Sequence, residues 1–266
     1  MRTKTVLTIL LTALIFLSAA VLGVSTVYRV SEVSVLSSVI SQEAKTEAAE
    51  LKNRLQTAYE KKSVFECNDE QAKAIVAEFA YFRYVSFQID YPNRLVISVS
   101  EDEEMYAVKR EDGGYYILGK EGTVLGIRDT SANRSDGAEN IRITGVTATG
   151  EKGASISGDG ALPALFELGE AISVRIPEIR RNVVSIEVLR PAATETEMQF
   201  VLTMREGVIL YVHNPLSMTK EKTEKAMDEY FALASAQRLS GAIWIAENDG
   251  NVIAKYYENA YLPPSN

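Results

Sequence analysis

Apolar and polar residues are distributed unevenly along the chain, and the most uneven segment lies near the N-terminus. Residues 6–28 (VLTILLTALIFLSAAVLGVSTVY) carry no charge, and the polar interruptions are Thr, Ser, Gly and Tyr. As an α-helix this run would extend about 34 Å, compared with about 30 Å for the hydrocarbon core of a bilayer. We therefore expect a transmembrane helix at Val6–Tyr28. The short leading segment, residues 1–5 with Arg2 and Lys4, favours a cytoplasmic N-terminus.

The same run has a second interpretation as a cleaved secretory signal. Ser18-Ala19-Ala20 supplies small residues near a possible cleavage point. The apolar region of a signal peptide is usually about 7–15 residues, which is shorter than this run and favours an uncleaved anchor. Under either interpretation the remainder, Arg29–Asn266, is exported.

Residues 29–101 show the pattern of a small α+β module with the order β-α-α-β-β. Tyr28–Leu36 alternates as a strand does, Ser41 can cap a helix to about Lys62, and a second helix starts near Asn68 or Asp69. Two alternating strands follow, with the turn at Tyr91–Arg94. The apolar side chains expected on one face of each strand are Val85, Phe87 and Ile89, and then Leu95, Ile97 and Val99.

Residues 102–260 have a β-rich pattern that includes two helices. Asp249-Gly250, between the last two strands, is the strongest hairpin signal in the chain. The predicted strands are Met105–Val108, Tyr115–Leu118, Thr123–Ile127, Val183–Leu189, Met198–Met204, Gly207–His213, Ala242–Ala246 and Asn251–Tyr257, and the predicted helices are Ala161–Ser173 and Met218–Leu239. The chain is therefore expected to be α+β: an N-terminal transmembrane helix, a β-α-α-β-β module, a mixed β-rich module with a late helix and a C-terminal hairpin, and a frayed tail at 261–266.

The charge balance excludes some classes of partner. The formal net charge is −8, and it becomes −10 for Arg29–Asn266 because Arg2 and Lys4 lie outside that range. An acidic chain is poorly suited to binding a nucleic-acid backbone over a broad surface. A single Cys also excludes an internal disulfide framework.

Candidate chemistry is sparse. Cys67 near a helix start and His213 are formally a Cys-His pair, but the pattern supplies no orienting group, and Cys67 also fits a half-buried structural position. The loop Gly150–Ser155 lacks the spacing of a phosphate-binding loop. The acidic run Glu101–Glu104 fits either weak Ca²⁺ binding or a solvated connection, and the latter is favoured. We expect no catalytic residue, cofactor or metal site, and hence no enzyme.

The last predicted strand remains as a candidate binding element. It is expected at a sheet edge, where unpaired N–H and C=O groups can accept a strand from another protein. An ordinary edge, blunted by Lys255 and Glu258, is equally compatible with the pattern. The residues of this strand are Asn251, Val252, Ile253, Ala254, Lys255, Tyr256 and Tyr257.

Residues 84–101 read YVSFQIDYPNRLVISVSE, and Tyr115–Leu125 reads YYILGKEGTVL. These stretches resemble motifs of the FtsQ/DivIB family of bacterial cell-division proteins. The first resembles the end of the family's POTRA domain, and the second resembles "Y-x-L-x-D-x-x-G-x-V-L", with Gly119 where Asp is usual. Ile143-Thr144-Gly145 resembles "P-x-I-x-G" without its Pro, and Lys220 or Lys222 matches a Lys at the start of the late helix. The order of elements is similar over nearly the whole chain.

The resemblance implies a non-enzymatic bitopic scaffold of the divisome in the cell membrane at the septum. Its partners would be FtsB/DivIC- and FtsL-like division proteins, other divisome components through the POTRA module, and the bilayer through Val6–Tyr28. Such a scaffold helps to control septal peptidoglycan synthesis. The alternative is an exported POTRA-type envelope assembly or binding protein that is not dedicated to division. In the family the partner site is the terminal edge strand and its surroundings, which here implies Ile243, Trp244, Tyr230, Glu247 and Asp249 in addition to the strand itself.

Overall fold

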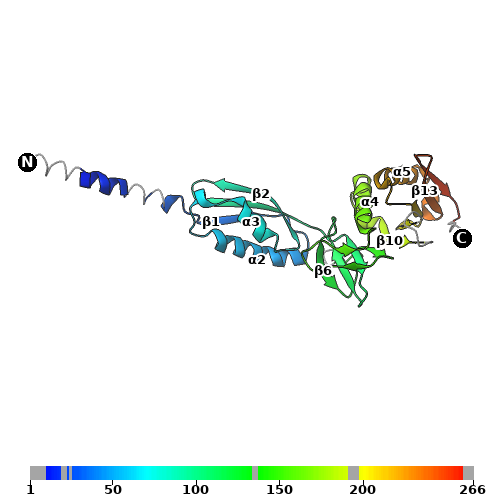
Figure 1. Ribbon diagram of the computed structural model, residues 1–266, viewed down its shortest axis with the longest axis horizontal. Helices are drawn as coiled ribbons and strands as arrows, with labels where there is room; N and C mark the ends of the chain where they lie inside the picture. The colour runs from blue at the N-terminus through cyan, green and yellow to red at the C-terminus, as the bar shows by residue number, and fades with distance from the viewer. Residues whose placement is uncertain (1–9, 19–22, 24–25, 134–136, 191–197, 260–266) are drawn as a thin grey trace, which may run out of the picture. The chain divides into compact units, whose positions relative to one another are not determined.

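The computed structural model describes residues 10–18, 23, 26–133, 137–190 and 198–259 (Figure 1). The chain divides into two compact units, residues 1–101 and residues 102–266. Each unit has its own sheet and its own helices.

The expected transmembrane helix at Val6–Tyr28 is not supported. In the described part of the chain, no helix has both the length and the apolar character needed to cross a bilayer. Residues 6–9, 19–22 and 24–25 of the predicted span lie outside the described residues. The prediction of a single-pass membrane location is corrected with it.

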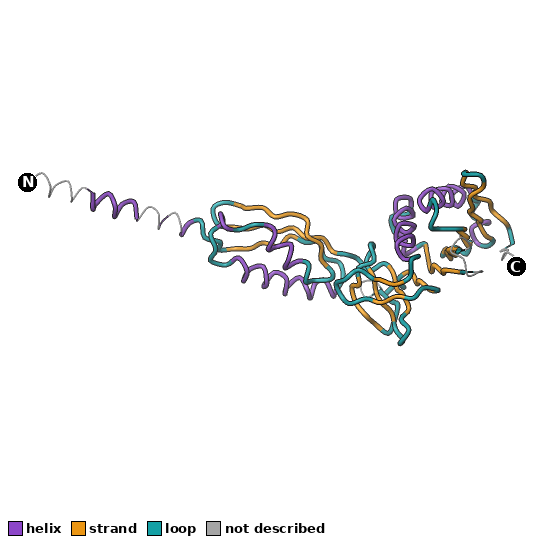
Figure 2. Tube along the Cα trace, in the orientation of Figure 1, coloured by secondary structure: helices purple, strands orange, loops and turns teal. Residues whose placement is uncertain are grey.

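Within residues 29–101, the first unit forms a three-stranded sheet with two α-helices. Its elements are β1 (Glu32–Leu36), α2 (Gln42–Tyr59), a 3₁₀ turn (Val64–Glu66), α3 (Asp69–Val76), β2 (Phe82–Asp90) and β3 (Arg94–Glu101). The strand order is β1-β3-β2, with β1 parallel to β3 and β2 antiparallel to β3. A parallel pair needs a long crossover, and the helices lie in that crossover (Figure 2).

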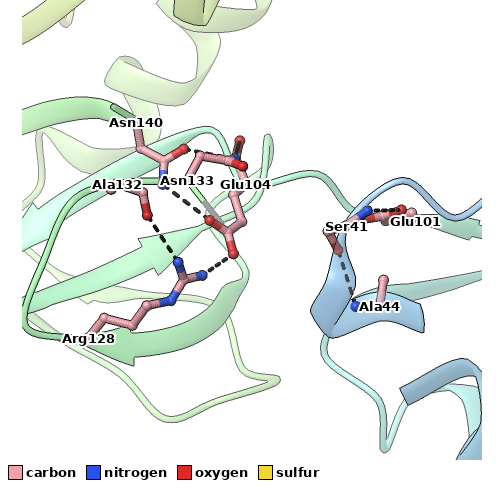
Figure 3. Close-up of polar contacts among 8 residues, drawn as sticks. All are labelled: Ser41, Ala44, Glu101, Glu104, Arg128, Ala132, Asn133 and Asn140. Atoms are coloured by element: carbon pink, nitrogen blue, oxygen red, sulfur yellow. Dashed lines mark hydrogen bonds and ion pairs between the residues drawn. The ribbon is translucent and has the colours of Figure 1, made fainter. Parts of the chain in front are cut away.

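The helices of this unit begin at side-chain caps. Ser41 Oγ accepts the N–H of Ala44 at 3.1 Å, and the N–H of Ser41 donates to the Glu101 carboxylate at 3.1 Å (Figure 3). Asn68 Oδ1 accepts the N–H of Gln71 at the start of α3. These bonds satisfy backbone donors that a helix leaves unpaired at its first turn. The predicted helix starts at Ser41 and Asn68 are confirmed.

The apolar face predicted for the strand that forms β2 is wrong at Val85. Val85 is 59% exposed, whereas Phe87 contacts the Tyr59 ring of α2. The register of β2 with β3 shifts between Tyr84 and Ser86, so Val85 occupies a β-bulge. A bulge adds one residue to a strand and therefore reverses the alternation that a regular pattern predicts.

The second unit contains a nine-stranded sheet in the order β14-β13-β12-β11-β10-β7-β4-β5-β6. Neighbouring strands are parallel at β12–β13, β10–β7 and β4–β7, and antiparallel elsewhere. The strands are β4 (Tyr106–Lys109), β5 (Tyr115–Leu118), β6 (Val124–Arg128), β7 (Ile141–Thr144), β10 (Val183–Leu189), β11 (Gln199–Met204), β12 (Ile209–His213), β13 (Ala242–Asn248) and β14 (Asn251–Tyr257). A small separate hairpin is formed by β8 (Ala148–Thr149) and β9 (Ser157–Gly158).

Two helices, α4 (Leu162–Arg175) and α5 (Thr219–Ala232), pack on this sheet. Their apolar side chains, such as Leu168 and Met227, form one buried cluster with inward-facing strand residues such as Phe200 and Ile245. A separate small cluster of Val201, Tyr211 and Ala242 comes from the alternate positions of the same strands. The helices therefore cover one face of the sheet, and α5 connects β12 to the parallel strand β13.

Two features of the second unit differ from the sequence prediction. The pattern did not predict β7, although this strand joins the two halves of the sheet by pairing with both β10 and β4. The late helix, predicted to reach Leu239, ends at Ala232. It ends because Leu233 takes an extended conformation and the Gln237 side chain accepts the N–H of Ala234, after which Gln237–Leu239 forms a 3₁₀ turn.

The acidic run before β4 is part of a buried polar network and not a solvated connection. Glu104 is 3% exposed and forms an ion pair with Arg128 of β6 (Figure 3). Arg128 also donates to the carbonyl of Ala132 at 3.1 Å, and Asn140 donates to the Glu104 carboxylate at 3.4 Å. The network ties the loop after β6 to the start of β4.

Candidate functional site: an open sheet edge and a neighbouring cavity

The strand β14 lies at the end of the nine-stranded sheet and pairs with β13 over its full length, from Asn248↔Asn251 to Ala242↔Tyr257. The turn between them is Asp249-Gly250, with φ of 50° and 76°. Two left-handed residues in a two-residue loop are the geometry of a type I′ hairpin, which Asp-Gly favours. The predicted hairpin is confirmed, and its turn sets the register of the edge strand.

The side chains of β14 alternate between the core and solvent. Val252, Ala254 and Tyr256 pack against the main hydrophobic cluster. Asn251 and Lys255 are exposed, and two apolar residues on the same side, Ile253 and Tyr257, are 50% and 41% exposed. The Lys255 ammonium lies 5.3 Å from the centre of the Tyr257 ring. The strand therefore presents an apolar and cationic row of side chains to solvent.

The hairpin geometry also determines which backbone groups face away from the sheet. In a two-residue hairpin the residues that flank the loop form a hydrogen-bonded pair, and such pairs alternate along the ladder. The backbone groups of Ile253, Lys255 and Tyr257 thus point to β13. The Tyr257 carbonyl oxygen agrees with this, since it would lie 2.5 Å from a Cβ added to Gly241.

The backbone groups of Val252, Ala254 and Tyr256 consequently point outward. Among the described residues, β14 pairs with β13 alone, and no further backbone hydrogen bond reaches the strand. Unpaired donors and acceptors at a regular spacing are the template that an added strand requires.

The residues expected around this edge have different roles. Ile243 is fully buried, and Tyr230 is 4% exposed with its hydroxyl donating to Glu206 at 2.9 Å. Burial, followed by the Glu206 carboxylate, raises the pKa of Tyr230 to about 12. These two residues support the hairpin from inside and offer little surface. Asp249 lies in the exposed turn.

Trp244 and Glu247 line a cavity of about 490 Å³, together with His213, Asn214, Lys222 and Ala246. The indole of Trp244 stacks on Tyr211 and on His213, with ring centres 4.8 Å and 4.6 Å apart. Sequence reasoning did not find this cavity, because its walls come from β12, α5 and β13 and no local spacing joins them.

The formal Cys-His pair has no support in the geometry. Cys67 belongs to the first unit and His213 to the second. Burial raises the pKa of the Cys67 thiol, and the thiol donates to the Ser63 carbonyl at 3.3 Å. A nucleophilic cysteine needs the opposite shift, because the thiolate is the reactive form.

The described part of the chain contains no group of three or more His, Cys, Asp or Glu side chains arranged to hold a metal ion. No protein-family model matches the chain, and no curated protein matches it.

Proposed function

We propose that this chain is a non-enzymatic scaffold of the bacterial division machinery, and that β14 takes up a strand from an FtsB/DivIC-like partner, with FtsL-like proteins in the same assembly. The single observation that carries the proposal is the edge itself. Over the whole of β14, the outward backbone groups have no hydrogen-bond partner among the described residues.

The FtsQ/DivIB-like motif supports the division context. Residues 84–101, which carry the strongest resemblance, form the hairpin of β2 and β3. This hairpin completes a β-α-α-β-β unit with the strand order β1-β3-β2. The proposal therefore assigns the first unit to the POTRA type and gives it contacts with other division proteins.

The exposed side chains indicate what kind of strand would fit. Ile253 and Tyr257 are two of the exposed large apolar residues, and Lys255 lies between them on the same side of β14. A partner strand would then place apolar side chains opposite Ile253 and Tyr257 and an acidic side chain opposite Lys255. Main-chain hydrogen bonds would provide affinity, and these three positions would provide specificity.

Depletion of the protein in its native cell tests the division context. Filamentation with unsplit septa is expected. An envelope defect without filaments would contradict the assignment to division and would favour a POTRA-type assembly or binding protein with another role. Binding of the purified chain to the soluble part of the FtsB/DivIC-like protein from the same organism tests the strand uptake separately.

A further inference from the structure

The outer edge of β14 is able to pair with an identical edge. Its outward backbone groups belong to Val252, Ala254 and Tyr256, because the hairpin register directs those of Ile253 and Lys255 to β13. Nothing among the described residues pairs with these outward groups. An antiparallel strand needs free groups on every second residue. A second copy of the chain offers the same three residues in the same spacing, so one edge can serve as the partner of another.

A twofold axis between two copies leaves few possible registers. With the axis at Ala254, this residue pairs with its own counterpart, and Val252 pairs with Tyr256 of the second copy. All three outward residues then form hydrogen-bonded pairs in both strands. An axis at Lys255 would place two ammonium groups directly opposite each other, which is destabilising. An axis at Ile253 would leave Tyr256 opposite the turn, outside the strand of the second copy.

The exposed side chains are compatible with the axis at Ala254. Ile253 then lies opposite Lys255 of the second copy, and Tyr257 lies opposite Asn251. No like charges meet, and the aliphatic stem of the lysine can cover the isoleucine. Ile253 and Tyr257 are 50% and 41% exposed in the single chain, so the pairing would cover part of two exposed apolar side chains. Ala254 is the smallest residue of the strand and occupies the axis, where a side chain meets its own copy.

We propose that β14 pairs antiparallel with β14 of a second copy of this chain, with the twofold axis at Ala254. The two nine-stranded sheets become one continuous sheet, and each copy contributes the same surface, as in an isologous dimer. The dimer uses the same edge as the proposed function but requires no other protein. Because both need the same backbone groups, self-pairing excludes a partner strand. One short strand gives a small interface, so the dimer forms at high local concentration and the dilute chain is monomeric.

Sedimentation velocity of the full chain over roughly a hundredfold range of concentration tests the self-pairing. A reversible equilibrium between monomer and dimer is expected. Ala254→Pro removes the central N–H of both strands and should weaken dimerisation by about tenfold or more. A chain that is monomeric at every concentration would overturn the proposal. Association that persists unchanged in Ala254→Pro would also overturn it, because the contact would then lie elsewhere.

Charge changes test the register. Ile253→Lys places an ammonium opposite Lys255 of the second copy, twice in each dimer, and should weaken dimerisation roughly tenfold. Adding Lys255→Glu to that chain places opposite charges across the interface and should restore dimerisation. Adding Lys225→Glu instead makes the same change of net charge at an exposed position of α5 and should restore nothing. Equal effects of the two added substitutions would exclude the axis at Ala254.

Engineered cysteines locate the axis directly. In a Cys67→Ser background, one chain carries Ile253→Cys and another carries Lys255→Cys. Across the proposed axis these positions form a non-hydrogen-bonded pair with Cα atoms about 4.5 Å apart, which a disulfide can span. With an added oxidant, the mixture of the two chains should therefore give a cross-linked dimer, and either chain alone should give none. Cross-linking of the Lys255→Cys chain to itself would overturn the register.

These three tests contain no protein other than this chain. Failure of self-pairing would therefore leave strand uptake from an FtsB/DivIC-like protein standing, and failure of that protein to bind would leave the dimer standing. If both occur, adding the soluble part of the FtsB/DivIC-like protein in excess should convert the dimer to complexes that contain one copy of this chain. A complex that keeps two copies cross-linkable at β14 would overturn the mutual exclusion.

Discussion

The two ends of the nine-stranded sheet differ in how their edges are treated. At one end, the backbone of β6 is covered at its start, because Val124 donates to the Ala154 carbonyl and accepts from Gly153, both at 2.8 Å. At the other end, β14 has seven residues in the ladder with β13 and no backbone partner on its outer side among the described residues.

The charged side chains at the two ends of the sheet differ in the same way as the backbone does. Arg128, the last residue of β6, turns inward to the buried Glu104 and holds the following loop through Ala132. Lys255, near the end of β14, remains exposed beside Tyr257. A protein that avoids edge-to-edge association normally protects both edges of a sheet. The cover at the start of β6, together with the open outer side of β14 along its whole length, therefore supports β14 as the place where a partner strand is added.

The largest expected effect is on stability, and it comes from removing the Glu104–Arg128 ion pair at the β6 end of the sheet. Glu104→Ala leaves the Arg128 guanidinium buried without its carboxylate, and should lower the free energy of unfolding by about 3–5 kcal/mol. Urea denaturation of the full chain measures this change. Glu139→Ala, which removes an exposed ion pair with Arg142, is the matched control and should cost at most about 1 kcal/mol. Equal effects of the two substitutions would show that the buried network does not stabilise this end.

The second prediction concerns partner binding at β14, the strand at the other end of the sheet. Ala254→Pro removes an outward N–H and should weaken binding of the FtsB/DivIC-like partner on the order of a hundredfold, while stability changes by about 1 kcal/mol or less. Ile253→Pro removes an N–H that points to β13 and should destabilise the hairpin more than Ala254→Pro does. Biolayer interferometry and thermal unfolding measure the two effects. Full binding by the Ala254→Pro chain would exclude strand addition at β14.

A smaller effect is expected from the charge on the open edge. Lys255→Glu reverses an exposed charge and should reduce the association rate of an acidic partner strand by roughly tenfold at low salt, with no loss of stability. The difference from the unmodified chain should shrink as salt is added. A salt-independent effect would indicate that Lys255 acts through packing and not through its charge.

The smallest effect concerns pH. Burial lowers the pKa of His213 in the folded chain, so the unfolded chain binds the proton more readily. Stability should therefore fall as pH decreases through the unfolded pKa of histidine, about 6.5, and this component is absent at higher pH. His213 is the only histidine in the chain, so His213→Gln should flatten the stability profile between pH 7 and pH 5. An unchanged profile would contradict the burial of a neutral imidazole beside Lys222.

Local patterns predicted much of the fold, because strands and caps are local features. The alternation of Asn251–Tyr257 and the Asp-Gly turn predicted the terminal hairpin, and Ser41 predicted a helix cap. The bulge at Val85 and the inward turn of Glu104 depend on neighbours distant in sequence, so no local pattern indicates them. The apolar run at residues 6–28 predicted a transmembrane helix, which the described residues do not support.

Only the local part of the candidate site, its edge strand, could be predicted from the sequence. Its edge strand is a local element, whereas the direction of its backbone groups needs the register with β13. In the cavity, Lys222 donates to the Asn214 carbonyl, and both residues line the same wall as Trp244. These positions depend on how α5, which connects β12 to β13, packs on the sheet. A lysine in an early helical turn has the pattern of a solvated position, so its burial could not be predicted.

Hydrogen exchange on the chain with and without the soluble part of the FtsB/DivIC-like partner tests the central claim most directly. The amides of Val252, Ala254 and Tyr256 should exchange rapidly in the free chain and become protected in the complex. The Val124 amide of β6 should be protected in both states, because it already donates to Ala154. A complex in which the three β14 amides still exchange rapidly would contradict the account.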